Sequence, residues 1–283
     1  MADQPDIVDS HQYFWDLGLR EYGFITEATP ALARDFLPAD LAPLMAGTGV
    51  TQTVLVQAHP SIEEGEWLLS LADDAPWVGG VVAWVDLASA DVGAQLDRLA
   101  HPMLKGVSHL VENEDDTAWL LRPDVDRGLA AVAERGLSYD VVVRPRHMRA
   151  IPEMARRHPD LRIVVDHIAK PRIAAGEREP WGTYMRAIAA CPNVWCKMSG
   201  LVTEDDPANV RAAHIKPFVD AVVRMLGFER LMFGSDWPVC TTVADYSRVL
   251  EVARECVAPA SDAQLRLFLA DNARAFYRMA PPV

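Results

Sequence analysis

RIVVDHIA, residues 162–169, contains the apolar, β-branched run IVV, which is followed by an acid and a histidine. Because the run is apolar at consecutive positions, it predicts a strand covered on both faces, as in a parallel sheet. Similar stretches recur along the chain, at residues 6–13, 52–58, 78–87, 105–110, 137–143, 193–200 and 230–237. The fold class follows from this repetition.

Helical patterns lie between these strands, for example at residues 63–74, 123–136 and 218–227, and the last two end in Gly136 and Gly227. Strands that alternate with helical crossovers in 283 residues predict an α/β fold, a (β/α)8 TIM barrel formed by one domain over residues 1–283. A doubly wound open sheet is the alternative, because periodicity does not show whether the sheet closes.

Two C-terminal segments and one long N-terminal segment lie outside the predicted alternation of strands and helices. Residues 245–257 and 262–279 predict extra C-terminal helices, and the poorly periodic residues 16–38 predict a long loop over the mouth of the barrel.

The composition excludes several classes of partner. A formal net charge of −13 argues against binding to nucleic acid or to an anionic membrane surface. The N-terminus has no basic start followed by an apolar region, and no apolar stretch approaches the roughly 20 residues that cross a bilayer. We therefore expect a cytoplasmic protein whose four cysteines, which form no CxxC pair, are free thiols. The sequence allows a homo-oligomer.

Polar side chains recur where the predicted strands end, which is where the functional groups of a parallel barrel lie. They are His11, Tyr13, Gln57, His59, Trp84, Asp86, His109, Arg144, Asp166, His167, Lys197, Ser199, Asp236 and Trp237. Within this set, Asp236 follows an apolar run and is expensive to bury without a role. His11 and His167 each lie near an aspartate, and each has a counterpart at another strand end.

Several of these residues also have purely structural interpretations. Asp9 and Asp166 can orient neighbouring groups, Lys170 and Lys197 can be ion-pair partners, Arg144 can be a surface charge, and the tryptophans can pack in the core. The sequence lacks a GxSxG elbow, a GxxxxGK[ST] loop and a GxGxxG turn. Hydrolysis by a carboxylate-activated water fits the polar strand ends best.

Six segments carry a family resemblance: VDSHQYFWD (8–16), VVAWVDL (81–87), VVDHIAKP (164–171), CKMSGL (196–201), LMFGSDWPV (231–239) and DNARAFY (271–277). Together they resemble the amidohydrolase-related lactone hydrolases, the amidohydrolase 2 type of the amidohydrolase superfamily. Members of that family open sugar-acid lactones or 2-pyrone-4,6-dicarboxylate. The segments run in order from the first strand to the last helix, so the resemblance covers nearly the whole chain.

The resemblance implies a TIM barrel that hydrolyses a ring ester. Asp236 would take a proton from the attacking water, while His11 and His167 polarise the lactone carbonyl. They would act directly, in a metal-free mechanism, or through one divalent ion, with zinc expected, held by His11, His167 and Asp236. We expect the small-molecule lactone to contact a further set of side chains, Tyr13, Gln57, Trp84, His109 and Trp237.

The chain departs from the family pattern at two positions. Tyr13 stands where members usually have a second histidine, which weakens any two-metal site because a phenol is an uncommon ligand. Ser108 stands where many members have an arginine, which would shift specificity. Two alternatives to the lactonase remain. One is a metal-dependent non-oxidative decarboxylase, which needs a firmly held metal and is disfavoured by Tyr13. The other is an inactive barrel that binds a small molecule, which Tyr13 and Ser108 would mark.

Overall fold

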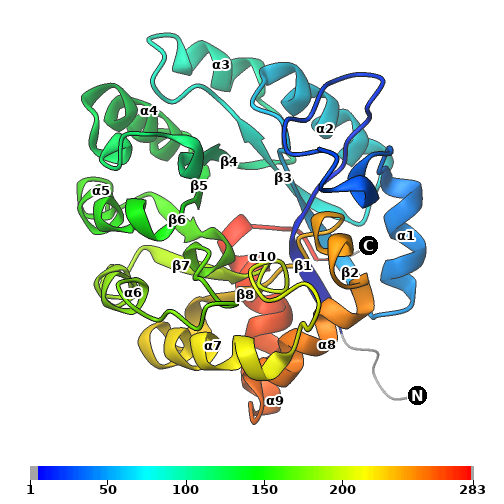
Figure 1. Cartoon of the computed structure of the whole chain (residues 1–283). Coiled ribbons are helices and arrows are strands. Elements are labelled where there is room, and N and C mark those ends of the chain that lie inside the picture. The colour runs from blue at the N-terminus through cyan, green and yellow to red at the C-terminus, as the bar shows by residue number, and fades with distance from the viewer. Residues whose placement is uncertain (1–5, 282–283) are drawn as a thin grey trace.

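The computed structural model describes residues 6–281, and its centre is a sheet of parallel strands in chain order. The strands are β1 (Ile7–Gln12), β2 (Val50–Val56), β3 (Val78–Trp84), β4 (Leu104–Leu110), β5 (Ser138–Val142), β6 (Arg162–Val165), β7 (Val194–Met198) and β8 (Leu231–Phe233). Each predicted strand is confirmed. The strands lie inside a ring of helices (Figure 1).

The helices are α1 (Pro38–Ala46), α2 (Ile62–Asp74), α3 (Val92–Arg98), α4 (Pro123–Glu134), α5 (Ile151–Arg157), α6 (Trp181–Ala189), α7 (Ala212–Leu226), α8 (Tyr246–Val257), α9 (Asp262–Arg266) and α10 (Asn272–Tyr277). The predicted helix at 218–227 begins six residues earlier, at Ala212. The predicted helix at 262–279 is divided, because a π-helical turn over Leu267–Asp271 separates α9 from α10.

The first and last strands meet, which decides between the barrel and the open sheet. The Ser10 hydroxyl donates to the carbonyl oxygen of Phe233 over 2.6 Å. Beyond the end of β8, the amide of Asp236 donates to the carbonyl oxygen of His11 over 2.9 Å, and the amide of Tyr13 donates to that of Trp237 over 2.8 Å. The sheet therefore curls into a (β/α)8 barrel, as predicted.

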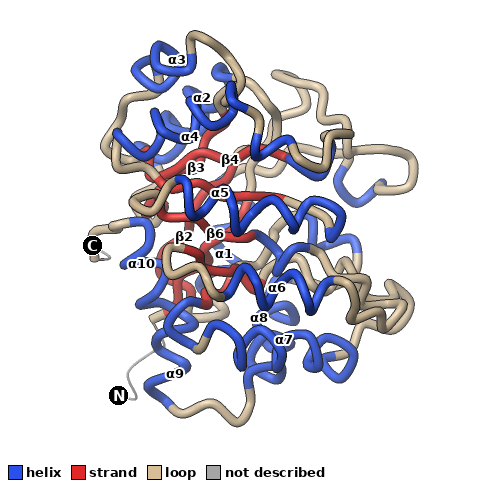
Figure 2. The backbone as a smooth tube through the Cα atoms, turned by 90° about the vertical axis from the view of Figure 1, so that its left-hand side faces the viewer, coloured by secondary structure: helices blue, strands red, loops and turns tan. Residues whose placement is uncertain are grey.

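The interior of the barrel is packed at one end and polar at the other. A small apolar cluster from the strands, which includes Val54, Val82 and Met232, contacts Phe276 and Tyr277 of α10. The C-terminal helix thus covers the end of the barrel at which the strands begin. This placement agrees with Figure 2, where α10 and the long loops lie at opposite ends of the molecule.

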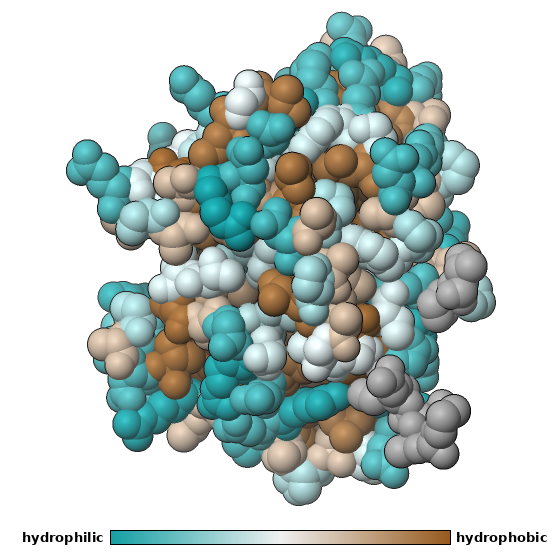
Figure 3. Space-filling view, turned by 90° about the vertical axis from the view of Figure 1, so that its right-hand side faces the viewer, coloured by the Kyte–Doolittle hydropathy of each residue, from teal (hydrophilic) through white to brown (hydrophobic). Residues whose placement is uncertain are grey.

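The expected loop over the mouth is present. Between the paired residues Trp15 and Phe36, the chain contains one short turn, Pro30–Leu32, and is otherwise irregular. This segment, called here the 16–37 loop, supplies Glu21 and Phe24 to the cavity described below. Figure 3 shows the side of the molecule, with a notch at its left edge between protruding loops. Within the described residues, no helix is both long and apolar enough to cross a membrane.

Candidate active site

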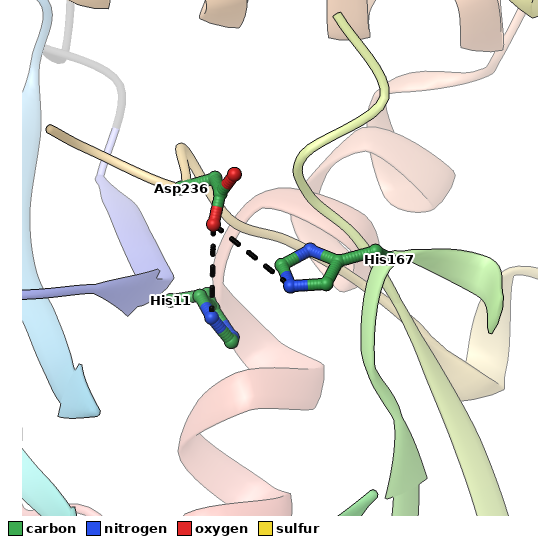
Figure 4. A group of neighbouring side chains, drawn as sticks. All are labelled: His11, His167 and Asp236. Carbon is green, nitrogen blue, oxygen red and sulfur yellow. Dashed lines mark ion pairs between the residues drawn. The ribbon is translucent and has the colours of Figure 1, made fainter. Parts of the chain in front are cut away.

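Three side chains from distant parts of the sequence meet at the mouth of the barrel. His11 belongs to β1, His167 lies just beyond the end of β6, and Asp236 follows β8. The Nε2 atom of His11 lies 3.9 Å from Asp236 Oδ1, and the Nε2 atom of His167 lies 3.8 Å from the same oxygen. Figure 4 shows both rings directed toward the carboxylate. All three residues are buried.

A left-handed turn presents His167 to this site. Residues 167–170 all have positive φ angles, between 44° and 62°, although none of them is a glycine. Each such residue costs roughly 1–2 kcal/mol, and strain of this kind is concentrated at functional sites. The amide of Lys170 donates to the carbonyl oxygen of His167 over 2.9 Å, and both side chains line the cavity.

The loop after β7 fixes the ring of His167. The Ser199 hydroxyl lies 2.9 Å from His167 Nδ1, which leaves Nε2 facing Asp236. The next residue, Gly200, has a φ of +62°, and a Cβ atom at this position would lie 2.6 Å from His167 Nδ1. Glycine therefore satisfies both the backbone conformation and the close approach of the ring.

A buried ammonium group lies beneath His11. The Nζ atom of Lys197 donates to Asp140 Oδ2 over 2.6 Å and lies 3.0 Å from both Asp166 Oδ1 and His11 Nδ1. The Tyr277 hydroxyl donates to the same oxygen of Asp140. Burial opposes a charge on Lys197, but the two carboxylates outweigh burial and raise its pKa. Lys197 is therefore a charged partner for His11.

Burial and these charges set the protonation states of the site. Burial, followed by Lys197 and Lys170, lowers the pKa of His11 well below its usual value. Burial and His11 lower the pKa of His167 in the same way, so both rings are neutral near pH 7. For Asp236, burial raises the pKa to about 7, although Lys170 and the Tyr13 hydroxyl oppose this shift.

Asp9 holds the segment that carries Asp236. Its carboxylate accepts hydrogen bonds from the Ser235 amide over 2.8 Å, from the Ser235 hydroxyl over 2.5 Å and from the Tyr246 hydroxyl over 3.0 Å. It also accepts from the amide of His11 over 3.2 Å. One buried carboxylate thus joins β1, which carries His11, to the segment after β8 that carries Asp236.

Tyr13 occupies the position of the missing histidine. Its hydroxyl lies 2.5 Å from His11 Nε2 and lines the cavity, so the two side chains share a face as strand alternation predicts. Burial, together with the negative charges of Asp236 and Asp166, raises the pKa of the phenol well above its usual value. Tyr13 therefore remains a neutral hydroxyl that can bond water or substrate.

A cavity of about 750 Å³ opens above these groups. Tyr13, Gln57, His167 and Asp236 all line it, and His11 lies beneath Tyr13. The side chain of Gln57 is buried, and neither of its amide atoms has a hydrogen-bond partner among residues 6–281. Because unpaired buried amides are rare, Gln57 has free capacity for a ligand.

The other predicted substrate contacts lie elsewhere. The indole of Trp84 donates to His109 Nδ1 over 3.3 Å, and His109 stacks on Trp119 with 4.2 Å between ring centres. Trp237 is buried, and its ring packs edge-on against Phe14 and Phe36. In the described part of the chain, none of these predicted contacts is among the residues that line the cavity.

Charged residues that sequence reasoning did not assign to the site also line the cavity. They are Glu21, Glu112, Arg144, Lys170 and Glu204. A signal existed for Lys170, which follows His167 by three residues, and for Arg144, which ends a strand. Glu112 and Glu204 lie in turns beyond their strands, and the sequence gives no sign that these turns return to the mouth.

The three central residues fit one divalent metal ion. Two ring nitrogens and one carboxylate oxygen, all within 4.8 Å of one another, form a suitable ligand set for zinc. The hydrogen-bond partners of both Nδ1 atoms, which orient the rings, are also present. A histidine at position 13 would add a third ring nitrogen beside His11 Nε2, where the Tyr13 hydroxyl now lies.

Replacing Tyr13 by histidine tests this ligand set. We expect Tyr13→His to bind zinc at least about tenfold more tightly than the wild type, because an imidazole replaces a phenol that does not ionise. Competition with a chromophoric chelator measures the affinity. Tyr13→Phe is the matched control and should show no gain. Equal zinc affinity in the two variants would contradict the ligand assignment.

Comparison with known proteins finds relatives that match nearly the whole chain. A family model described as amidohydrolase matches residues 8–279. An L-fucono-1,5-lactonase from Burkholderia ambifaria is 40% identical over 97% of this chain and 96% of its own length. A second L-fucono-1,5-lactonase, from Burkholderia multivorans, is 36% identical over 86% of this chain and 85% of its own.

A solved structure is similarly close. The crystal structure of an amidohydrolase from Burkholderia multivorans with bound zinc is 33% identical and has a TM-score of 0.93. The alignment covers 98% of this chain and 100% of that one.

Proposed function

Because this chain belongs to the amidohydrolase family, we propose that it is a lactonase that opens a sugar-acid lactone to its hydroxy acid. One observation carries the proposal. A buried carboxylate with a pKa near 7 faces two neutral imidazoles at the floor of a cavity. The L-fucono-1,5-lactonases that share 36–40% of the sequence support this substrate class.

In this proposal Asp236 is the base. A water molecule between Asp236 and the lactone carbonyl gives a proton to the carboxylate as its oxygen attacks the carbonyl carbon. When the ring ester bond breaks, the same carboxyl group returns the proton to the departing ring oxygen. Asp236 is suited to both steps, because its pKa of about 7 lies near neutral pH.

His11 and His167 orient and polarise the carbonyl oxygen. Lys197 and Ser199 can donate to their Nδ1 atoms, so each neutral ring can carry its proton on Nε2 and point it into the site. A divalent ion held by His11, His167 and Asp236 would supply Lewis-acid polarisation of the same oxygen.

The experiment that tests the proposed function is acid release from a panel of lactones by the purified protein. L-Fucono-1,5-lactone and other aldonolactones should be hydrolysed well above the buffer rate. Carbon dioxide release from aromatic acids would instead support the decarboxylase. Ligand-induced thermal stabilisation without turnover would support the inactive barrel. Neither alternative is favoured by the named relatives.

The pH dependence follows from the protonation of Asp236. Since the base acts only when ionised, kcat/KM should fall about tenfold for each pH unit below about 7 and level off above that value. The measurement is kcat/KM from about pH 5 to about pH 9 on chelator-treated protein. Lys170 lowers the pKa of Asp236, so Lys170→Met should move the inflection to higher pH. A flat profile down to about pH 5 would contradict the assignment.

A further inference from the structure

The charged side chains at the mouth of the cavity have a role beyond the chemistry of the floor. We propose that they select an uncharged lactone and repel its carboxylate product, and that Glu204 determines this selectivity by occupying Arg144. The inference rests on the proposed lactonase function and adds a specificity device to it.

The device is a chain of alternating charges, called here the charged arc: Lys170, Glu112, Arg144 and Glu204. Lys170 Nζ donates to Glu112 Oε1 over 2.6 Å, and Arg144 Nε lies 3.2 Å from Glu112 Oε2. Arg144 Nη1 then lies 3.2 Å from both carboxylate oxygens of Glu204. The members follow β6, β4, β5 and β7, so the arc spans neighbouring strand ends.

Both cations of the charged arc, Lys170 and Arg144, are paired with carboxylates. Arg144 is about half exposed, but Glu112 and Glu204 are only 15% exposed and are held against it. Each cation in the arc already faces at least one carboxylate. An incoming carboxylate would have to displace one of these partners, whereas the hydroxyl groups of a sugar ring can donate to the carboxylates as they stand.

Without a bound metal ion, the described lining of the cavity has an excess of negative charge. Its described lining includes four carboxyl groups, Glu21, Glu112, Glu204 and Asp236, and two cations, Arg144 and Lys170. At separations of several ångströms in a partly buried site, an unpaired charge of this kind alters the affinity of an ion by roughly tenfold. Ser108, at the position where an arginine is common in the family, is buried and adds no cation.

The reaction changes the charge of the bound molecule. A neutral lactone and one water molecule give a hydroxy acid, which releases a proton and becomes a carboxylate at neutral pH. Substrate therefore enters without electrostatic cost, while product is formed among like charges that favour its departure. Gln57, with both amide atoms unpaired, can bind either molecule and does not discriminate by charge.

The test is the variant Glu204→Gln, which releases Arg144 from one carboxylate. Calorimetry would measure the binding of L-fuconate, the anionic product of L-fucono-1,5-lactone, and of L-fucose, an uncharged ring of related shape. We expect the variant to bind L-fuconate about tenfold more tightly and to bind L-fucose within about twofold of the wild type. The gain for L-fuconate should shrink in high salt.

Glu229→Gln is the matched control. Glu229 is exposed and lies directly before β8, at the opposite end of the barrel, so this variant should leave both affinities unchanged. Unchanged L-fuconate binding in Glu204→Gln, or an equal gain for both probes, would overturn the inference. So would wild-type protein that binds L-fuconate more tightly than L-fucose.

The outcomes distinguish a failure of this inference from a failure of the proposed lactonase function. Suppose that the wild-type protein hydrolyses lactones but Glu204→Gln binds L-fuconate no more tightly. This result would contradict the proposed role of the charged arc and would still support the lactonase function. Protein that hydrolyses no lactone and binds neither probe would overturn the proposed function, and the inference with it.

Discussion

Replacing Asp236 by asparagine should lower kcat by about a thousandfold while KM changes little. Asparagine has the shape of aspartate but cannot accept a proton, so the attacking water loses its base. The two imidazoles still orient the carbonyl, which preserves binding. Initial rates of acid release, corrected for spontaneous hydrolysis, measure the effect.

A second aspartate provides the control for this experiment. Asp160 is exposed and lies before β6, at the end of the barrel away from the cavity. Asp160→Asn should therefore keep wild-type activity. A general base usually contributes a factor of about 100 or more to the rate. If Asp236→Asn retained more than about a tenth of the wild-type kcat, Asp236 would not be that base.

Adding one methyl group at Gly200 should be nearly as harmful. A Cβ atom there would lie 2.6 Å from His167 Nδ1 and 3.0 Å from Asp236 Oδ2. The ring of His167 would have to move and lose its hydrogen bond to Ser199. Because a displacement of about 1 Å at a reacting group can cost about a hundredfold in rate, we expect kcat/KM of Gly200→Ala to fall by at least that factor.

Gly176→Ala separates crowding from backbone strain. Gly176 has almost the same φ, +63°, but a Cβ atom there meets nothing within 4 Å. Both variants should lose roughly 1–2 kcal/mol of stability from the left-handed conformation, and chemical denaturation would measure this loss. Only Gly200→Ala should lose activity. Similar activity in both variants would show that the contact with His167 is not required.

Much of the fold could be predicted from the sequence because each strand carries its own signal. Apolar runs such as 163–165 identify strands without reference to the rest of the chain. Closure of the barrel could not be predicted, since it depends on long-range bonds such as that of Ser10 to Phe233. The division of residues 262–279 was also missed: the structure has α9, a π-helical turn over Leu267–Asp271 and α10 where the sequence predicted one continuous helix.

The centre of the site could be predicted for a similar reason. His11, His167 and Asp236 all lie at strand ends, and parallel strands bring their ends together. Trp237 is not among the described residues that line the cavity. Asp236, which precedes it, has a left-handed φ of +61°, so the regular alternation of side chains does not continue past Asp236. Glu112 and Glu204 reach the mouth through turns whose paths depend on tertiary contacts, which local sequence does not encode.

The central claim, that Asp236 activates water and does not itself attack the lactone, is tested most directly by a single turnover in ¹⁸O-labelled water with enzyme in excess over L-fucono-1,5-lactone. Mass spectrometry of the product and of the peptide that contains Asp236 gives the position of the label. We predict ¹⁸O in the carboxylate of the hydroxy acid and none in Asp236. Label in the Asp236 carboxylate would show a covalent acyl-enzyme and contradict the account.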